Sequence, residues 1–212
     1  MNSLGMDSRS VSKVAILRRW VHSRLGASEH ERRVGAIAAT LVRLTSAMHS
    51  LSTPDIRLLK MAAMVHDVGR SVSKKNHPAI GARMLRRGKH LPLKSRQRRA
   101  LAYLTLYHRG QVPDWNEAKK EILRPGDDAA RLRLILAFLR AADSLDSRSQ
   151  PRPSLTFQVR GRRIRIICRL AEDTAKARKI FSRRKKFRLL EELLDCRVEV
   201  TLQSSRRLRL VA

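Results

Sequence analysis

The spacing of apolar residues changes once along this chain, and that change limits the fold more than any other feature of the sequence. From Val11 to about Leu145, apolar residues recur at intervals of three and four, which is the period of an amphipathic helix. After the proline-containing residues 150–153 they alternate with polar or basic residues, which is the period of a strand. We therefore predict a helical domain over residues 1–150 and a small α+β domain over residues 151–212.

Helix-start and helix-stop signals divide the first part into a mainly α bundle. Ser28-Glu29-His30-Glu31 has the sequence of a capping box, in which the Ser28 hydroxyl and the Glu31 carboxylate would each bond a backbone amide. Thr53-Pro54 and His77-Pro78 each place a cap before a proline at the first helical position. The signals together predict helices over Val11–Leu25, Ser28–Leu44, Thr53–Gly69, His77–Gly88, Ser95–Arg109 and Ala129–Leu145, with a short piece around Trp115–Leu123.

The second part has the pattern of a small α+β appendage. Leu155, Phe157 and Val159 alternate with polar residues, as do Ile164, Ile166 and Cys168, and Gly161 lies between the two runs. This pattern predicts a β-hairpin. It is followed by a predicted helix over Ala171–Leu194 and by further strands at Val198–Leu202 and Leu208–Val211.

Composition narrows the class of protein. The longest apolar stretches, such as Leu134–Leu139, are bounded by arginines and fall far short of the roughly 20 residues that a membrane span needs. There are only two cysteines, with no CxxC pair, and the first ten residues have no secretory signal. We expect a soluble, cytoplasmic protein with no disulfide framework and no membrane contact; a homo-oligomer is compatible with these features.

The net charge indicates phosphate-rich partners. The chain carries 47 Lys and Arg against 18 Asp and Glu, a formal charge of +29, which attracts polyanions. Aromatic residues make up only 4% and form no stacking pattern, so sequence-specific reading of single strands is not expected. The alternative interpretation is an arginine-rich composition on solvated faces.

Histidines and aspartates near predicted helix ends are the candidate functional residues. His22, His49 and His90 are interpreted as surface or core residues, whereas another set lies close to helix ends: His30, His66, Asp67, His77, His108 and Asp143. Short side chains at the ends of several helices can converge at one end of a bundle, where metal sites are often built. A mixture of imidazole and carboxylate suits Mn, Fe, Co, Ni or Zn. Asp146 is an alternative to Asp143, but the apolar residues before Asp143 predict that it is the deeper of the two.

These residues, in this order, resemble the HD superfamily of metal-dependent phosphohydrolases. The segments AAMVHDVGRSVSKKNHPAIGARML, YHRGQVP and LRAADSLDSR are more narrowly similar to the C-terminal region of the exopolyphosphatase and guanosine pentaphosphate phosphatase family. The likeness covers about residues 28–150 and implies an HD-type bundle. That family also has actin-like domains that hydrolyse polyphosphate, and the residues before Ser28 are too few to form them, so we do not expect that activity.

The resemblance also implies roles for the six residues. His30, His66, Asp67 and Asp143 match the ligands of a first metal, and His77 and His108 match those of a second, with Asp67 shared between them. His66 and Asp67 are therefore the expected catalytic pair. Arg70, Lys74, Lys75 and Arg109 adjoin these segments and are candidate substrate-binding residues; the alternative is that they are solvated charges.

Three functional hypotheses follow from the sequence. The first is a hydrolase that uses one or two divalent transition-metal ions on a phosphate ester or anhydride, such as a nucleotide or another small polyanion. The second is a regulatory module that binds polyphosphate or non-specific nucleic acid through its basic residues, with a structural or vestigial metal. The third is a chain that acts beside a partner carrying the actin-like domains.

Overall fold

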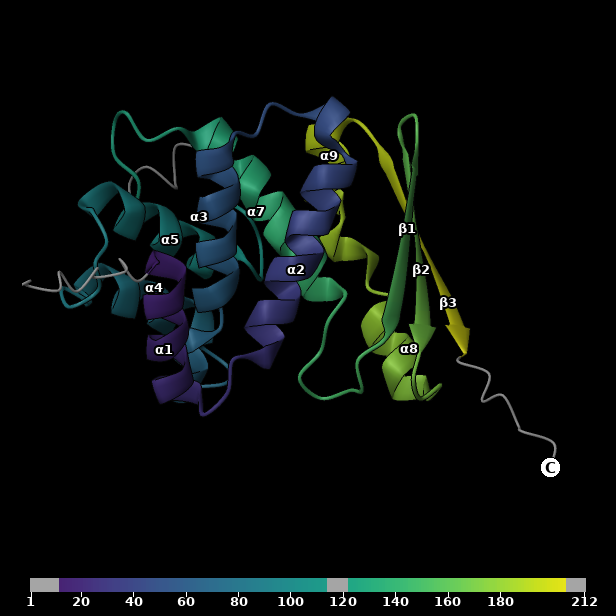
Figure 1. Cartoon of the computed structure of the whole chain (residues 1–212), viewed down its shortest axis with the longest axis horizontal. Helices are drawn as coiled ribbons and strands as arrows, with labels where there is room; N and C mark the ends of the chain where they lie inside the picture. Colours follow the sequence, from purple (N-terminus) through teal and green to yellow (C-terminus); the bar gives the residue numbers. More distant parts are fainter. Residues whose placement is uncertain (1–11, 114–121, 205–212) are drawn as a thin grey trace, which may run out of the picture.

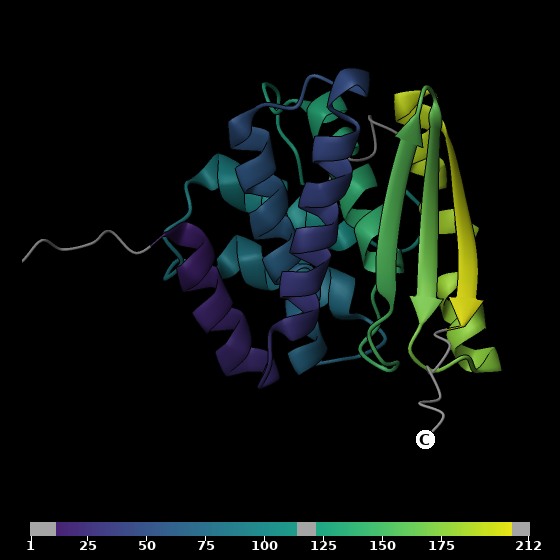
Figure 2. The same cartoon turned by 45° about the vertical axis from the view of Figure 1, so that its right-hand side comes forward.

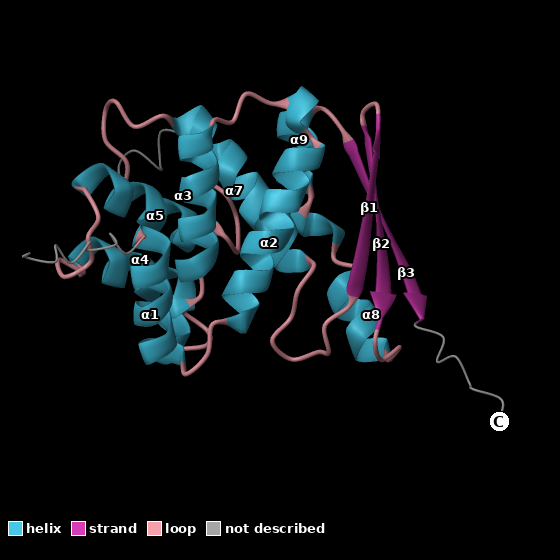
Figure 3. Cartoon of the chain, viewed as in Figure 1, coloured by secondary structure: helices cyan, strands magenta, loops and turns pink. Residues whose placement is uncertain are grey.

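The computed structural model describes residues 12–113 and 122–204. Helices form one side of the molecule, and three strands lie together at the other (Figure 1, Figure 3). The helical part consists of α1 (Lys13–Leu25), α2 (Glu29–Leu44), α3 (Thr53–Val65), α4 (His77–Arg87), α5 (Ser95–Tyr107) and α7 (Ala129–Ser144). None of the helices in these ranges combines the length and the hydropathy needed to cross a bilayer. The chain is mainly helical with a small C-terminal sheet, as the sequence predicts.

The helix ends follow the predicted signals, with several corrections. Gly26 ends α1 in a left-handed conformation (φ +73°), and Gly88 ends α4. The cap of α3 is Ser52, not Thr53: its side chain and that of Asp55 form the capping box. The cap of α4 is Asn76. The caps of both helices are therefore one residue earlier than predicted.

Two other helix-end predictions are wrong. Ser28 makes no side-chain cap bond; its backbone N–H donates to the carboxylate of Glu29, and the Glu31 carboxylate binds Arg148. The third helix ends at Val65, not at Gly69, and a short 3₁₀ turn over Val68–Ser71 follows it. The helix around Trp115–Leu123 lies largely outside the described residues, as does the strand at Leu208–Val211.

The predicted hairpin is confirmed. β1 (Ser154–Arg160) pairs antiparallel with β2 (Arg163–Leu170), and β2 pairs parallel with β3 (Arg197–Ser204), so the sheet order is β1-β2-β3 (Figure 2). The parallel pair requires a crossover, which the intervening helices supply.

The single helix predicted over Ala171–Leu194 is wrong. The segment forms α8 (Ala175–Phe181), a 3₁₀ turn (Arg184–Lys186) and α9 (Arg188–Leu194). Phe181 and Phe187 are both buried, in different hydrophobic clusters, and residues six apart in an α-helix point about 120° apart, so one continuous helix would not direct both toward the same face. The break between α8 and α9 resolves this conflict.

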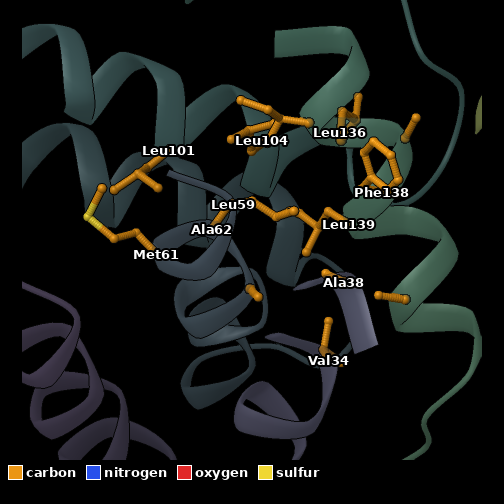
Figure 4. Close-up of a cluster of buried hydrophobic side chains, with 14 of the residues drawn as sticks. Val34, Ala38, Leu59, Met61, Ala62, Leu101, Leu104, Leu136, Phe138 and Leu139 are labelled. Carbon is orange, nitrogen blue, oxygen red and sulfur yellow. The ribbon is translucent and has the colours of Figure 1, made fainter. Parts of the chain in front are cut away.

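The main hydrophobic core lies between α2, α3, α5 and α7. Figure 4 shows side chains of these four helices directed toward one another, including Val34, Leu59, Leu104 and Phe138. The same buried cluster continues into the C-terminal part through Ile164, Ile166, Phe187, Leu190 and Val198. The sheet and α9 therefore extend the core of the bundle.

Candidate metal centre

The six predicted ligands come together, and each lies at a helix end. His30 is the second residue of α2, His66 follows the last residue of α3, and His77 is the first residue of α4. His108 follows α5, and Asp143 lies in the last turn of α7. The four histidines and Asp67 are buried, and Asp143 is nearly so.

The four imidazole rings are oriented in the same way. The Nδ1 atoms of His66, His77 and His108 lie 2.8, 2.9 and 2.6 Å from the carbonyl oxygens of Ala63, Lys74 and Thr105. A carbonyl only accepts, so in each ring Nδ1 carries the proton. Nδ1 of His30 lies 2.6 Å from a carboxylate oxygen of Asp146. Each Nε2 is thus directed away from its anchoring partner, the arrangement that prepares an imidazole to bind a metal.

The Nε2 atoms surround two carboxylates. Nε2 of His77 and of His108 lie 3.0 and 3.6 Å from Oδ1 of Asp67, and Nε2 of His30 lies 3.9 Å from its Oδ2. Nε2 of His30 and of His66 both lie 3.5 Å from Oδ1 of Asp143. The two oxygens of Asp67 therefore face different histidines, which is the geometry a shared ligand needs.

The donor set fits divalent cations. Two overlapping groups have ligand atoms within 4.8 Å of one another: His30, His66 and Asp143, and His66, Asp67 and His108. Nε2 of His66 is buried without a hydrogen-bond partner among the described residues. Nε2 of His77 lies 3.2 Å from Nε2 of His108, and two such lone pairs repel each other unless a proton or a cation lies between them. The centre is therefore built to hold positive charge.

The pKa shifts of these residues also favour a positive charge at the centre. Burial would raise the pKa of Asp67, but the charge of His66 and the hydrogen bonds to His108 and His77 together hold that pKa well below its usual value. Burial would lower the pKa of His30, but hydrogen bonds to Asp143 and Asp146 raise it to about 9. Burial lowers the pKa of His108 to about 4. Asp67 stays ionised and the metal-free His30 holds a proton, so a bound cation would displace that proton.

Asp146 supports the centre from outside. Its Oδ2 accepts from His30 and its Oδ1 lies 2.8 Å from Nε of Arg33. The prediction that Asp143 is the deeper carboxylate is wrong, because the Asp146 side chain is 2% exposed and that of Asp143 is 14% exposed. The two carboxylates differ in the atom of His30 that they contact: Asp146 binds Nδ1, whereas Asp143 lies 3.5 Å from Nε2.

Two cations at the centre were not predicted. Nε of Arg148 lies 2.9 Å from Oδ2 of Asp67, and its guanidinium also binds the fully buried Glu31. Nζ of Lys186 donates to Oδ2 of Asp143 and lies 3.3 Å from the carbonyl oxygen of His108. The only sequence signal for Lys186 is that it ends the basic run 183–186, which lies within the helix predicted over Ala171–Leu194.

A cavity of about 210 Å³ opens onto the centre. His30, Asp67, Asp143 and Asp146 line it, together with five cationic side chains: Arg70, Arg109, Arg148, Arg183 and Lys186. Arg70 and Arg109 therefore border the centre, and Nε of Arg70 lies 3.6 Å from Asp67. Lys74 and Lys75 are exposed and lie outside this lining; Lys74 contributes its carbonyl oxygen to His77.

Gly69 explains how α4 reaches the centre. A Cβ built on Gly69 would lie 2.2 Å from the carbonyl oxygen of His77 and 2.6 Å from the amide nitrogen of Gly81. Only a residue without a side chain allows the 3₁₀ turn after Asp67 to lie this close to the start of α4. The close approach places His77 beside Asp67.

These features define the class: a helical-bundle domain with a buried His/Asp cluster that could hold a metal. The model of the family "Ppx/GppA phosphatase, domain III" matches residues 27–161, which is more than half of the chain, and the chain belongs to this family. The match extends from the start of α2 to the hairpin turn and includes all six predicted ligands. A comparison with curated proteins found no match.

Proposed function

We propose that this protein is a metal-dependent phosphohydrolase acting on a phosphate ester or anhydride, with a nucleotide or another small polyanion as substrate. One observation carries the proposal: four Nε2 atoms and two ionised carboxylates converge, and three of these residues, His30, Asp67 and Asp143, line a cavity that is also lined by five cationic side chains. The His/Asp cluster suits divalent cations, and the cationic side chains that line the cavity suit phosphate oxygens.

The ligand types favour Mn, Fe, Co, Ni or Zn over Mg or Ca, because four of the six donors are imidazole nitrogens. When bound, one or two such cations would lower the pKa of a water molecule and neutralise negative charge developing on the phosphoryl oxygens. Asp67 would be shared between them, since its two oxygens face different histidines. His66 belongs to both ligand groups, so its loss would affect either cation.

The rim determines how the substrate enters. Arg70 and Arg148 already contact Asp67, and Arg109 and Arg183 line the same cavity. Guanidinium groups bind phosphate oxygens with two parallel hydrogen bonds and so orient the phosphoryl group over the centre. The cavity volume of about 210 Å³ accommodates a phosphoryl group while the rest of a nucleotide stays outside.

The test combines elemental analysis with phosphate release. The purified protein is expected to carry roughly one or two transition ions per chain. Inorganic phosphate is then measured after incubation with nucleoside mono-, di- and triphosphates and with p-nitrophenyl phosphate, with Mn²⁺, Co²⁺, Ni²⁺ or Zn²⁺ supplied. The parent should hydrolyse at least one of these, whereas His66→Ala and Asp67→Ala should lose both metal and activity.

Matched variants separate loss of the site from loss of the fold. His22→Ala removes an exposed histidine of α1 and should leave metal content and activity unchanged. Asp67→Asn keeps the shape of the side chain, and circular dichroism shows whether it folds. Equal metal content in the parent and both site variants would refute the proposal, as would phosphate release that survives Asp67→Asn.

The binding-module hypothesis predicts a different pattern. Pure polyanion binding should weaken steeply as the salt concentration rises, and replacement of His66 or Asp67 should not change it. Copurification of a partner would support the third hypothesis, in which actin-like domains come from another chain.

A further inference from the structure

A second basic site lies on the outer face of the sheet. We call it the arginine face and define it by Arg160 of β1, Arg162 of the hairpin turn, Arg163, Arg165 and Arg169 of β2, and Arg197 of β3. All six are exposed, with the Arg163 and Arg197 side chains 60% and 73% exposed. Five of them line a cavity of about 670 Å³ that contains no residue of the metal centre.

The register of the sheet brings these charges together. Arg160 is paired with Arg163, and Arg163 with Arg197, so three arginines lie in one row across three strands. Their neighbours along β2, Ile164 and Ile166, are buried on the opposite face. Like charges directly opposite each other destabilise a sheet. The sheet therefore carries an energetically unfavourable row of like charges on the face that does not pack against the core.

Few carboxylates compensate the arginine face. Glu199 is 3.7 Å from Arg163 and 3.6 Å from Arg197, so one carboxylate serves both. Asp195, which is 91% exposed, lies 3.7 Å from Arg162. Arg160 and Arg165 contact no carboxylate among the described residues. Several guanidinium groups are thus available to an external anion.

We propose that the arginine face binds the phosphodiester backbone of a double-stranded nucleic acid. Arg163 and Arg169 lie six residues apart on one strand, which corresponds to roughly 20 Å. A row of that length fits an extended polymer rather than a single phosphate group. Guanidinium groups suit phosphate oxygens, and such contacts bind without reading sequence.

The duplex is favoured over a single strand by what the face contains. Single-strand binders stack bases on exposed aromatic rings. On this face the other outward residues of the strands include Gln158, Thr156 and Thr201, and no large aromatic side chain is exposed among the described residues. The face therefore offers charge and hydrogen-bond donors without a stacking platform.

The experiment measures fluorescence anisotropy of a labelled duplex of about 20 base pairs, made as DNA and as RNA, over a range of salt concentrations. The test variant is Arg160→Gln/Arg163→Gln/Arg165→Gln. The matched control is Arg18→Gln/Arg19→Gln/Arg24→Gln, which removes the same charge from exposed positions of α1. Asp67→Asn is included to separate this site from the metal centre.

Binding of either duplex should weaken at least about tenfold in the test variant relative to the control, and the salt slope should fall by about 2 to 3 because each phosphate contact contributes about 0.9. Asp67→Asn should bind as the parent does, whether or not the protein is a hydrolase. Equal weakening in both triple variants, no binding by the parent, or a single strand bound as tightly as the duplex would overturn the proposal. So would tighter binding of inorganic polyphosphate through the same three arginines.

Discussion

At the scale of single residues, the histidines of the metal centre are held in two ways. His66, His77 and His108 each donate to a carbonyl three residues earlier, so their orientation is a local property of the chain. His30 instead depends on Asp146, which is 116 residues away in the sequence. Removal of one carboxylate should therefore affect one ligand selectively.

We predict that Asp146→Ala lowers metal affinity about 10- to 100-fold, because His30 loses the group that orients its ring. Asp146→Asn retains an acceptor oxygen and should recover part of the loss. Affinity is measured by competition with a chromogenic chelator. Asp173→Asn, which breaks a surface pair with Arg178, is the control. An unchanged affinity in Asp146→Ala would show that His30 is not a ligand or does not need this support.

At the scale of elements, close backbone approach decides where α4 lies. The 3₁₀ turn after Asp67 contacts the start of α4 through Gly69 and Gly81, whose missing side chains leave room for backbone and for Thr105. Gly35 differs, because a Cβ there would lie 3.6 Å from Cβ of Ala63, an ordinary contact distance. Substitution of Gly69 and of Gly35 should therefore have opposite effects on stability.

We predict that Gly69→Ala destabilises the protein by about 1–3 kcal/mol, because the added carbon overlaps rigid backbone. Gly35→Ala should stabilise it by about 0.5–1 kcal/mol, because it removes a flexible residue from the interior of α2. Urea unfolding followed by circular dichroism measures both. Stabilisation by Gly69→Ala would contradict the close approach drawn between this turn and α4.

At the scale of the whole molecule, the bundle and the sheet share a core, and the segment between α8 and α9 contributes to the site. Ile164, Phe187 and Val198 belong to the same buried cluster as the residues of α2 and α7. Lys186, from the turn between α8 and α9, reaches Asp143 of α7. This residue lies outside the segment matched by the family model, so the C-terminal part contributes to the rim of the cavity.

We predict that chelation lowers the melting temperature by about 5–10 °C. A ligand at 100 times its Kd stabilises the folded state by about 2.7 kcal/mol, and each kcal/mol shifts the midpoint by about 2–4 °C at this size. Bundle and sheet should unfold in one transition because they share a core. Scanning calorimetry tests both statements. Asp67→Asn should show no shift with chelator, and a separate transition for the sheet would mean that the shared core is too weak to couple the two parts.

The sequence alone determined the helical bundle, the hairpin and the approximate helix ends, because apolar period and capping residues act locally. It also indicated the six candidate ligands, which lie close to those helix ends. Only the tertiary structure decided which cationic side chains contact these ligands. Arg148 is 81 residues from Asp67, and Lys186 is 43 residues from Asp143, so nothing in the local sequence predicts either pair. Lys74 and Lys75 show the converse: they adjoin His77 in the chain but lie outside the lining of the cavity, because proximity in sequence does not specify where a side chain points.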